Sequence, residues 1–156
     1  MKRREFIAAL GGAAAWPVAA RTQPTGKSLE GTAQPLIGFL NSASPDTYRF
    51  NANSFREGLA KAGFVEGRNV RIEERWANGD YRALPGLAAE LVEKGVVAIA
   101  ATGDVASARA AQEASSTVPV VFTIGGDPVR FGLIKSINRP GGHVTGRAKN
   151  ARVDRS

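Results

Sequence analysis

Short polar side chains and glycines gather in three turns of this 156-residue chain, each directly after an apolar run. The turns contain Asn41-Ser42, Thr102-Gly103-Asp104 and Gly125-Gly126-Asp127. Thr102 and Asp104 stand where helix N-caps stand, and the free N–H groups and positive dipole end of a helix suit an anionic ligand group such as a carboxylate. The same residue types also cap helices and form turns without any ligand, so capping alone is the alternative interpretation.

Residues suited to covalent or redox chemistry are scarce. The chain has no cysteine, which excludes disulfides, thiolate metal sites and thiol nucleophiles. Its one histidine, His143, follows a Pro-Gly-Gly turn and is expected to be a solvated loop residue rather than a metal ligand. Neither a Gly-x-x-x-x-Gly-Lys-Ser/Thr loop nor a Gly-x-Gly-x-x-Gly pattern is present, so nucleotide binding lacks its usual cradle. The sequence therefore predicts no catalytic residue, no metal and no cofactor.

The adjacent carboxylates Glu73 and Glu74 fall within an expected strand. Neighbouring side chains of a strand point to opposite faces, so these two cannot share one site. They are interpreted as solubilising charge on an edge strand. Trp76, at the end of the same strand, is expected to pack against the fold rather than stack on a ligand.

The elements that must position the three turns alternate along the chain between the hydrophobic spacing of strands and that of helices. Apolar runs predict buried parallel strands at 36–40, 96–101 and 119–123, with an edge strand at 70–76 and a last short strand at 143–146. Helical spacing and stop residues predict helices at 46–62, 105–114 and 129–137, and another that begins at Leu84 and stops at Gly95.

Repeated strand–helix–strand units define the expected fold class. They predict an α/β, doubly wound three-layer domain with a mainly parallel sheet of about five strands. In such sheets ligands bind outside the carboxyl ends of the strands, near the point where the strand order reverses. This rule selects the same three turns.

The amino-terminal end differs in composition from the rest of the chain. Residues 1–20 combine the pair Arg3-Arg4, an apolar run and a small-residue exit, which predicts a twin-arginine-like or general secretory export signal. The apolar run is shorter than the roughly 20 residues that span a bilayer, so stable membrane insertion is not expected. Residues 21–34 are interpreted as a flexible leader, and a periplasmic location follows.

The net charge of +7 is concentrated at the two ends. Residues 1–21 carry four basic groups and one acid, and so do residues 147–156, which leaves 13 basic and 12 acidic groups, or +1, for residues 22–146. Phosphate binding needs Lys and Arg concentrated on one face, so nucleic acid is not an expected partner. We expect an α/β lobe at 35–146 and an unstructured basic tail at 147–156.

Several stretches, in order and correctly spaced, resemble the amino-terminal lobe of ABC transporter substrate-binding proteins with a type I periplasmic binding fold. They lie at 35–46, 55–59, 63–70, 100–103, 120–129, 138–142 and 144–146. The resemblance implies the periplasmic solute-binding component of an ABC-type uptake transporter, with an amino acid or similar small molecule as solute and an ABC permease as partner.

The resemblance also implies which residues contact the solute. Carried over residue by residue, they are Asn41, Ser42, Thr102, Gly103, Gly126 and Asp127. Asp104 and His143 depart from the family pattern, which more often has a small residue and an asparagine at these positions, and this puts a solute contact through Asp104 in doubt.

Members of this family carry a second lobe, so the resemblance implies a truncated chain, with an interrupted reading frame as the hypothesis. A single wall supplies about half the contacts of a closed clamp, and weak or no ligand binding is expected from this lobe alone. The alternative is a small exported α/β enzyme or a stand-alone sensor lobe with Asp46 and Asp127 as acidic groups. Mutation of Asp127 would separate them, since lost turnover favours the enzyme.

Overall fold

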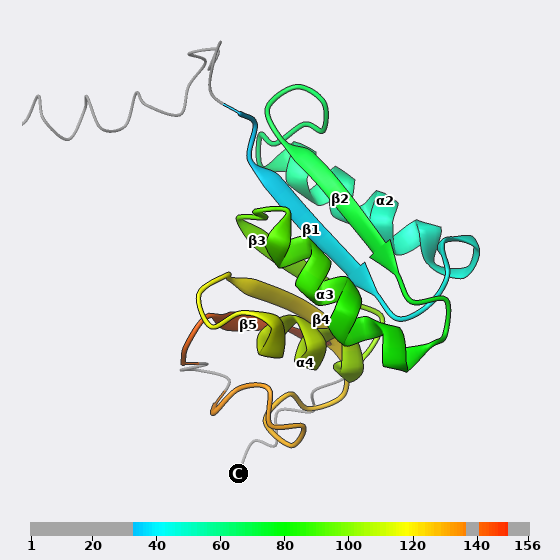
Figure 1. The fold of residues 1–156 in the computed structure, drawn as a ribbon, viewed down its shortest axis with the longest axis vertical. Helices are drawn as coiled ribbons and strands as arrows, with labels where there is room; N and C mark the ends of the chain where they lie inside the picture. Colours follow the sequence, from blue (N-terminus) through cyan, green and yellow to red (C-terminus); the bar gives the residue numbers. More distant parts are fainter. Residues whose placement is uncertain (1–32, 137–140, 150–156) are drawn as a thin grey trace, which may run out of the picture. The chain divides into compact units, whose positions relative to one another are not determined.

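The computed structural model describes residues 33–136 and 141–149 (Figure 1). The predicted export signal, nearly all of the predicted leader and residues 150–156 of the predicted tail lie outside the described residues.

Five parallel strands form one sheet in the order β2-β1-β3-β4-β5. Their bounds are β1 Leu36–Asn41, β2 Arg71–Trp76, β3 Ala98–Thr102, β4 Val120–Gly125 and β5 Val144–Lys149. The predicted α/β class and the edge position of β2 are confirmed. The chain leaves β1 toward β2 and then crosses to β3 on the other side of β1, so the strand order reverses between β1 and β3.

Helices cover both faces of the sheet. These are α2 Pro45–Lys61, α3 Leu84–Glu93 and α4 Val105–Ala114, with the short 3₁₀ helix η1 at Tyr81–Ala83. Leu91 of α3 and Ala108 of α4 belong to the larger apolar core with Leu40 and Ile99, whereas Ala52 of α2 packs with Phe39 in a second core. Figure 1 views the sheet from the side of α3 and α4, and the predicted three layers are confirmed.

The helix predicted at 129–137 is wrong for its described part, where the structure has turns. After Pro128 the chain completes one turn, and Gly132 then takes φ +70°. The Gly132 N–H donates to the Val129 carbonyl at 2.9 Å and the Leu133 N–H to the Pro128 carbonyl at 3.0 Å, the paired bonds of a Schellman motif. This motif ends the helix after a single turn, although the apolar spacing continues.

Strand β5 continues to Lys149, past the lobe boundary predicted at Gly146. Arg147 pairs with Thr123 of β4 in register, so residues 147–149 belong to the sheet rather than to the predicted tail. The loss of apolar periodicity after Gly146 is a poor guide here, because a parallel ladder is built from backbone groups and an edge strand tolerates polar side chains.

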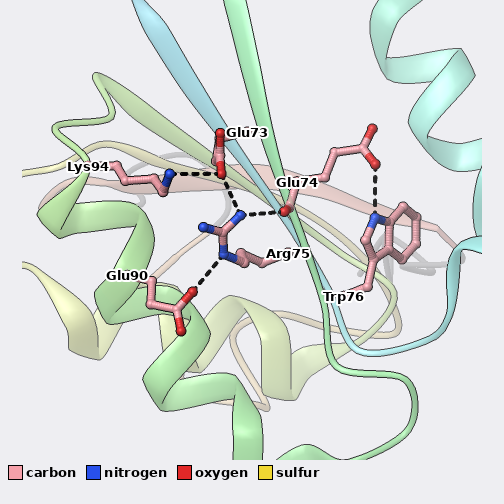
Figure 2. Close-up of polar contacts among 6 residues, drawn as sticks. All are labelled: Glu73, Glu74, Arg75, Trp76, Glu90 and Lys94. Atoms are coloured by element: carbon pink, nitrogen blue, oxygen red, sulfur yellow. Dashed lines mark hydrogen bonds and ion pairs between the residues drawn. The ribbon is translucent and has the colours of Figure 1, made fainter.

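Charged side chains of β2 bind the strand to α3 on one face of the sheet (Figure 2). Arg75 Nη1 donates to Glu73 Oε1 at 2.6 Å, and its Nε donates to Glu90 Oε2 of α3 at 2.7 Å. Lys94 Nζ lies 3.2 Å from the same Glu73 oxygen. The hydrogen bonds from Arg75 and then Lys94 lower the pKa of Glu73.

The next residue of β2 serves the opposite face. Glu74 accepts hydrogen bonds from Arg56 of α2 and, at 2.9 Å, from Trp76 Nε1. The two glutamates therefore point away from each other, as their adjacent positions on a strand predict (Figure 2).

Candidate functional site at the carboxyl ends of β1 and β3

Asn41 and Thr102 meet where the strand order reverses. Asn41 is fully buried, its Nδ2 donates to Thr102 Oγ1 at 2.8 Å, and its Oδ1 accepts from the Ala43 N–H at 2.8 Å. Because a backbone N–H can only donate, the bond from Ala43 fixes which amide atom is oxygen. Nδ2 carries a second hydrogen, for which the described part of the chain provides no hydrogen-bond acceptor.

Gly103 brings the turn after β3 against the turn after β1. Its φ of +99° is a left-handed conformation that side chains disfavour. A Cβ at this position would lie 2.8 Å from Ser42 Oγ and 2.9 Å from Asn41 Oδ1. Only glycine permits both the backbone conformation and this approach.

Asp104 occupies the N-terminus of α4 with its own carboxylate. Its Oδ1 accepts from the Ser107 N–H at 3.1 Å and lies 3.4 Å from the Ser107 hydroxyl, and Ser107 is fully buried. The expectation that this helix start suits an anionic ligand group therefore needs correction. The negative charge that the helix dipole favours is already supplied by the protein.

Tyr81 joins this site, although no sequence motif singles it out. After β2 the Ala77 N–H donates to the Asn41 carbonyl at 2.9 Å and the Gly79 N–H to the Ser42 carbonyl at 2.8 Å, which carries Tyr81 to the carboxyl ends. A side-chain hydrogen bond to Asp104, and then the charge of that carboxylate, raise the pKa of Tyr81. A hydrogen bond with Ser42 acts in the opposite direction. The carboxyl-end rule applied to β2 would have selected this turn.

The third predicted turn follows β4 and has contacts of its own. Asp127 Oδ1 accepts from the Val129 N–H at 2.9 Å, which caps the local turn. Gly126 has φ +105°, and a Cβ there would lie 2.9 Å from the Phe131 ring. Within the described residues no hydrogen bond joins Gly126 or Asp127 to Asn41. The structure thus brings together Asn41, Ser42, Thr102 and Gly103, and leaves the third turn as a neighbour.

Trp76 has a structural role. Its ring centroid lies 5.3 Å from that of Phe39, and its Nε1 donates to Glu74, so the expectation that it packs agrees with the geometry.

His143 differs from the solvated loop residue expected. It is half-buried, and its Nε2 is enclosed with no hydrogen-bond partner. It lines a cavity of about 560 Å³ along α4, to which none of the six predicted contact residues contributes.

The described ranges 33–136 and 141–149 contain no group of three or more His, Cys, Asp or Glu side chains arranged to hold a metal ion. They also contain no helix with the length and apolar character needed to cross a membrane.

Comparison with known proteins shows which family the chain belongs to. The sequence profile described as ABC transporter substrate binding protein matches residues 37–156. A tyrosine-binding protein of Clostridioides difficile (strain R20291) is 31% identical over 132 residues, which are 83% of this chain and 37% of that protein.

Solved structures agree. A domain from Streptococcus pneumonia in complex with L-Trp superimposes with a TM-score of 0.67 at 26% identity, covering 74% of this chain and 39% of that one. The ligand-free, open structure of a substrate binding protein with adhesive properties from Clostridium difficile superimposes with a TM-score of 0.69 at 28% sequence identity. The match covers 77% of this chain and 40% of that one. The chain thus spans about two fifths of the length of the proteins it matches, and it belongs to the ABC transporter substrate binding protein family.

Proposed function

We propose that the carboxyl ends of β1 and β3 form one wall of a solute site in the periplasmic binding component of an ABC-type uptake transporter. Asn41, Ser42, Thr102 and Gly103 contact the solute, with Gly126 and Asp127 at the side. The observation that carries the proposal is the buried Asn41 amide, which holds Thr102 with one hydrogen and offers the second for a ligand. A buried donor without an acceptor costs about 1–3 kcal/mol, and a ligand acceptor would offset this cost.

An amino acid is the proposed solute, and binding without turnover is the proposed activity. Two relatives support this choice, since one is named for tyrosine binding and another was solved with L-Trp. Export by the predicted signal at 1–20 and delivery to an ABC permease complete the proposal.

The affinity of this single wall is proposed to be weak. A closed site buries most of a small ligand, whereas one wall leaves half of it in water while the full entropy of capture is still lost. Binding on the order of 1 mM corresponds to only about 4 kcal/mol. A calorimetric titration with micromolar affinity for L-tyrosine would contradict this part of the proposal.

Gly103→Ala tests the location of the site. The added methyl would occupy the space between Ser42 and Asn41, so the amide shifts that L-tyrosine or L-Trp causes at residues 41–43 and 102–104 in ¹H–¹⁵N NMR titrations should be lost. Gly95→Ala is the matched control, because Gly95 has φ +78° but open space around its Cβ position. Both variants carry a backbone strain of about 1–3 kcal/mol, and only Gly103→Ala adds the clash.

The outcomes separate clearly. Unchanged shifts in a folded Gly103→Ala variant, or shifts that cluster away from these turns in the wild type, would reject the location. Thr102→Val provides a second test that adds no volume clash: it removes the acceptor of the Asn41 amide and should weaken the same shifts several-fold.

A further inference from the structure

The turns at the carboxyl edge of the sheet share one sign of charge. Residues 41–47, 77–81, 103–107 and 125–129 each contain one aspartate and neither lysine nor arginine. The aspartates are Asp46, Asp80, Asp104 and Asp127. Arg82 and Arg130, the first cations after two of these turns, are exposed. A site whose border carries a single sign of charge favours a ligand group of the opposite sign.

Asp104 is the aspartate that the hydrogen bonds tie to the proposed contact residues. Its Oδ1 is fixed by Ser107 at the start of α4, and its carboxylate interacts with the Tyr81 hydroxyl, which in turn interacts with Ser42. Gly103, the residue before it, lies so close to the other turn that a Cβ there would be 2.8 Å from Ser42 Oγ and 2.9 Å from Asn41 Oδ1. The carboxylate therefore belongs to the residue that directly follows the contact of Gly103 with Asn41 and Ser42.

We propose that Asp104 is a specificity-determining residue of the solute site and selects a solute with a primary ammonium group. This inference rests on the proposed function and concerns the same wall. An ammonium donates to the carboxylate as a charge-assisted hydrogen bond and donates to the Tyr81 phenol oxygen at the same time. A carboxylate placed against the start of α4 meets the charge of Asp104 instead of the free positive end of the helix.

Tyr81 supports this selection as a neutral group. A phenol is neutral at pH 7, so the Tyr81 O–H donates to Asp104 and the Tyr81 oxygen lone pairs accept from the ammonium. Tyr81 is 57% exposed, which leaves the outer side of the pair open to an incoming solute.

The test uses two half-ligands that share the tyrosine ring. Tyramine has the ammonium without the carboxylate, and 3-(4-hydroxyphenyl)propionate has the carboxylate without the ammonium. In ¹H–¹⁵N NMR titrations of the wild-type chain at pH 7, tyramine should shift the amides of residues 102–107 and bind at least tenfold more tightly than the propionate. Asp104→Ser keeps a capping oxygen but removes the charge, and it should abolish or reverse this preference.

Asp80→Ser is the matched control. Asp80 also caps a helix, since its Oδ1 accepts from the Arg82 N–H at 3.1 Å, and its loss changes the net charge of the rim by the same amount. It should leave most of the preference for tyramine intact. If both variants lose the preference for tyramine equally, the preference comes from the summed negative charge of the rim, and the specific role of Asp104 is rejected.

The remaining outcomes distinguish this inference from the proposed function. If L-tyrosine shifts the rim amides but the wild type prefers the propionate, or Asp104→Ser keeps the tyramine preference, the inference fails and the binding site stands. If none of the three probes shifts the rim in the folded wild type, the proposed function fails and the inference fails with it.

Discussion

At the scale of single residues, the site depends on groups held in unusual local states. Asn41 is buried with one donor hydrogen unpaired within the described structure, Gly103 has a left-handed backbone, and Tyr81 faces a carboxylate. The first two states would be costly in isolation and are imposed by the neighbouring turn, which is characteristic of sites that bind ligands.

The titration of Tyr81 is a direct prediction. The pKa of its phenol should lie above the ordinary value of 10.0, because ionisation would remove the hydrogen bond to Asp104 and place a second negative charge beside that carboxylate. Tyr48→Phe leaves Tyr81 as the only tyrosine, so absorbance near 295 nm, about where tyrosinate absorbs, reports it alone. Asp104→Asn should return the pKa toward 10.0. An unchanged titration in Asp104→Asn would contradict the contact.

The sign of the linked stability follows. The folded state holds this proton more tightly than the unfolded chain, so the contribution is fully present below the ordinary tyrosine pKa of 10.0 and is lost as the pH rises through the raised value.

At the scale of elements, the edge strand β2 is attached to helices by ion pairs on both faces. Arg75 connects Glu73 of the strand to Glu90 of α3, and Arg56 of α2 reaches Glu74. Side chains in these pairs are 20–53% exposed, so each contributes at most about 1 kcal/mol. Their main effect is to hold β2, and the turn that follows it, in register with β1.

Glu73→Gln tests this attachment. The pKa of Glu73 is lowered by Arg75 and Lys94, so its contribution is present above the ordinary value of 4.5 and is lost as the pH falls through the lowered one. Urea unfolding should show a loss of about 0.5–1 kcal/mol at pH 7 that shrinks at acidic pH, as the pH falls below 4.5 and through the lowered pKa of Glu73. Glu93→Gln, on α3 and without an ion pair among the described residues, should change stability little at either pH. A loss that persists at the acidic pH would refute the ionic origin.

At the scale of the whole molecule, the outer strand β5 depends on one glycine. Gly146 lies opposite Phe122 in the ladder, and a Cβ there would lie 2.2 Å from the Phe122 carbonyl oxygen and 2.6 Å from its ring. Backbone cannot yield as a flexible side chain does, so the two strands would have to separate.

Gly146→Ala should therefore lower the free energy of unfolding by about 3 kcal/mol or more, beyond the usual cost of a small core addition. Hydrogen exchange of the β5 amides should rise with it, since an edge strand that loses its partner opens first. Gly125→Ala on β4, which meets nothing within 4 Å, is the control and should be nearly neutral. Equal stability of the two alanine variants would show that β5 is not packed against Phe122 as described.

The sequence by itself determined where apolar residues recur at strand spacing and where at helix spacing, and this alternation determined the parallel sheet. Apolar runs and stop signals located the strands and helices closely enough that α4 has the predicted bounds, and the carboxyl-end rule then selected Asn41 and Thr102. It failed at 129–137, because apolar spacing does not reveal that Gly132 closes a Schellman motif after one turn.

Only the tertiary structure decided what the turns do to one another. The loop after β2 is bonded to the turn after β1, and this long-range contact places Tyr81 against Asp104. The sequence predicts only that Asp104 caps a helix, whereas the fold also places its negative charge beside the proposed contact residues. A local sequence pattern indicates the backbone conformation that a few neighbouring residues prefer. The electrostatic field at a site and the hydrogen-bond donors left unpaired there depend instead on contacts between segments far apart in the chain.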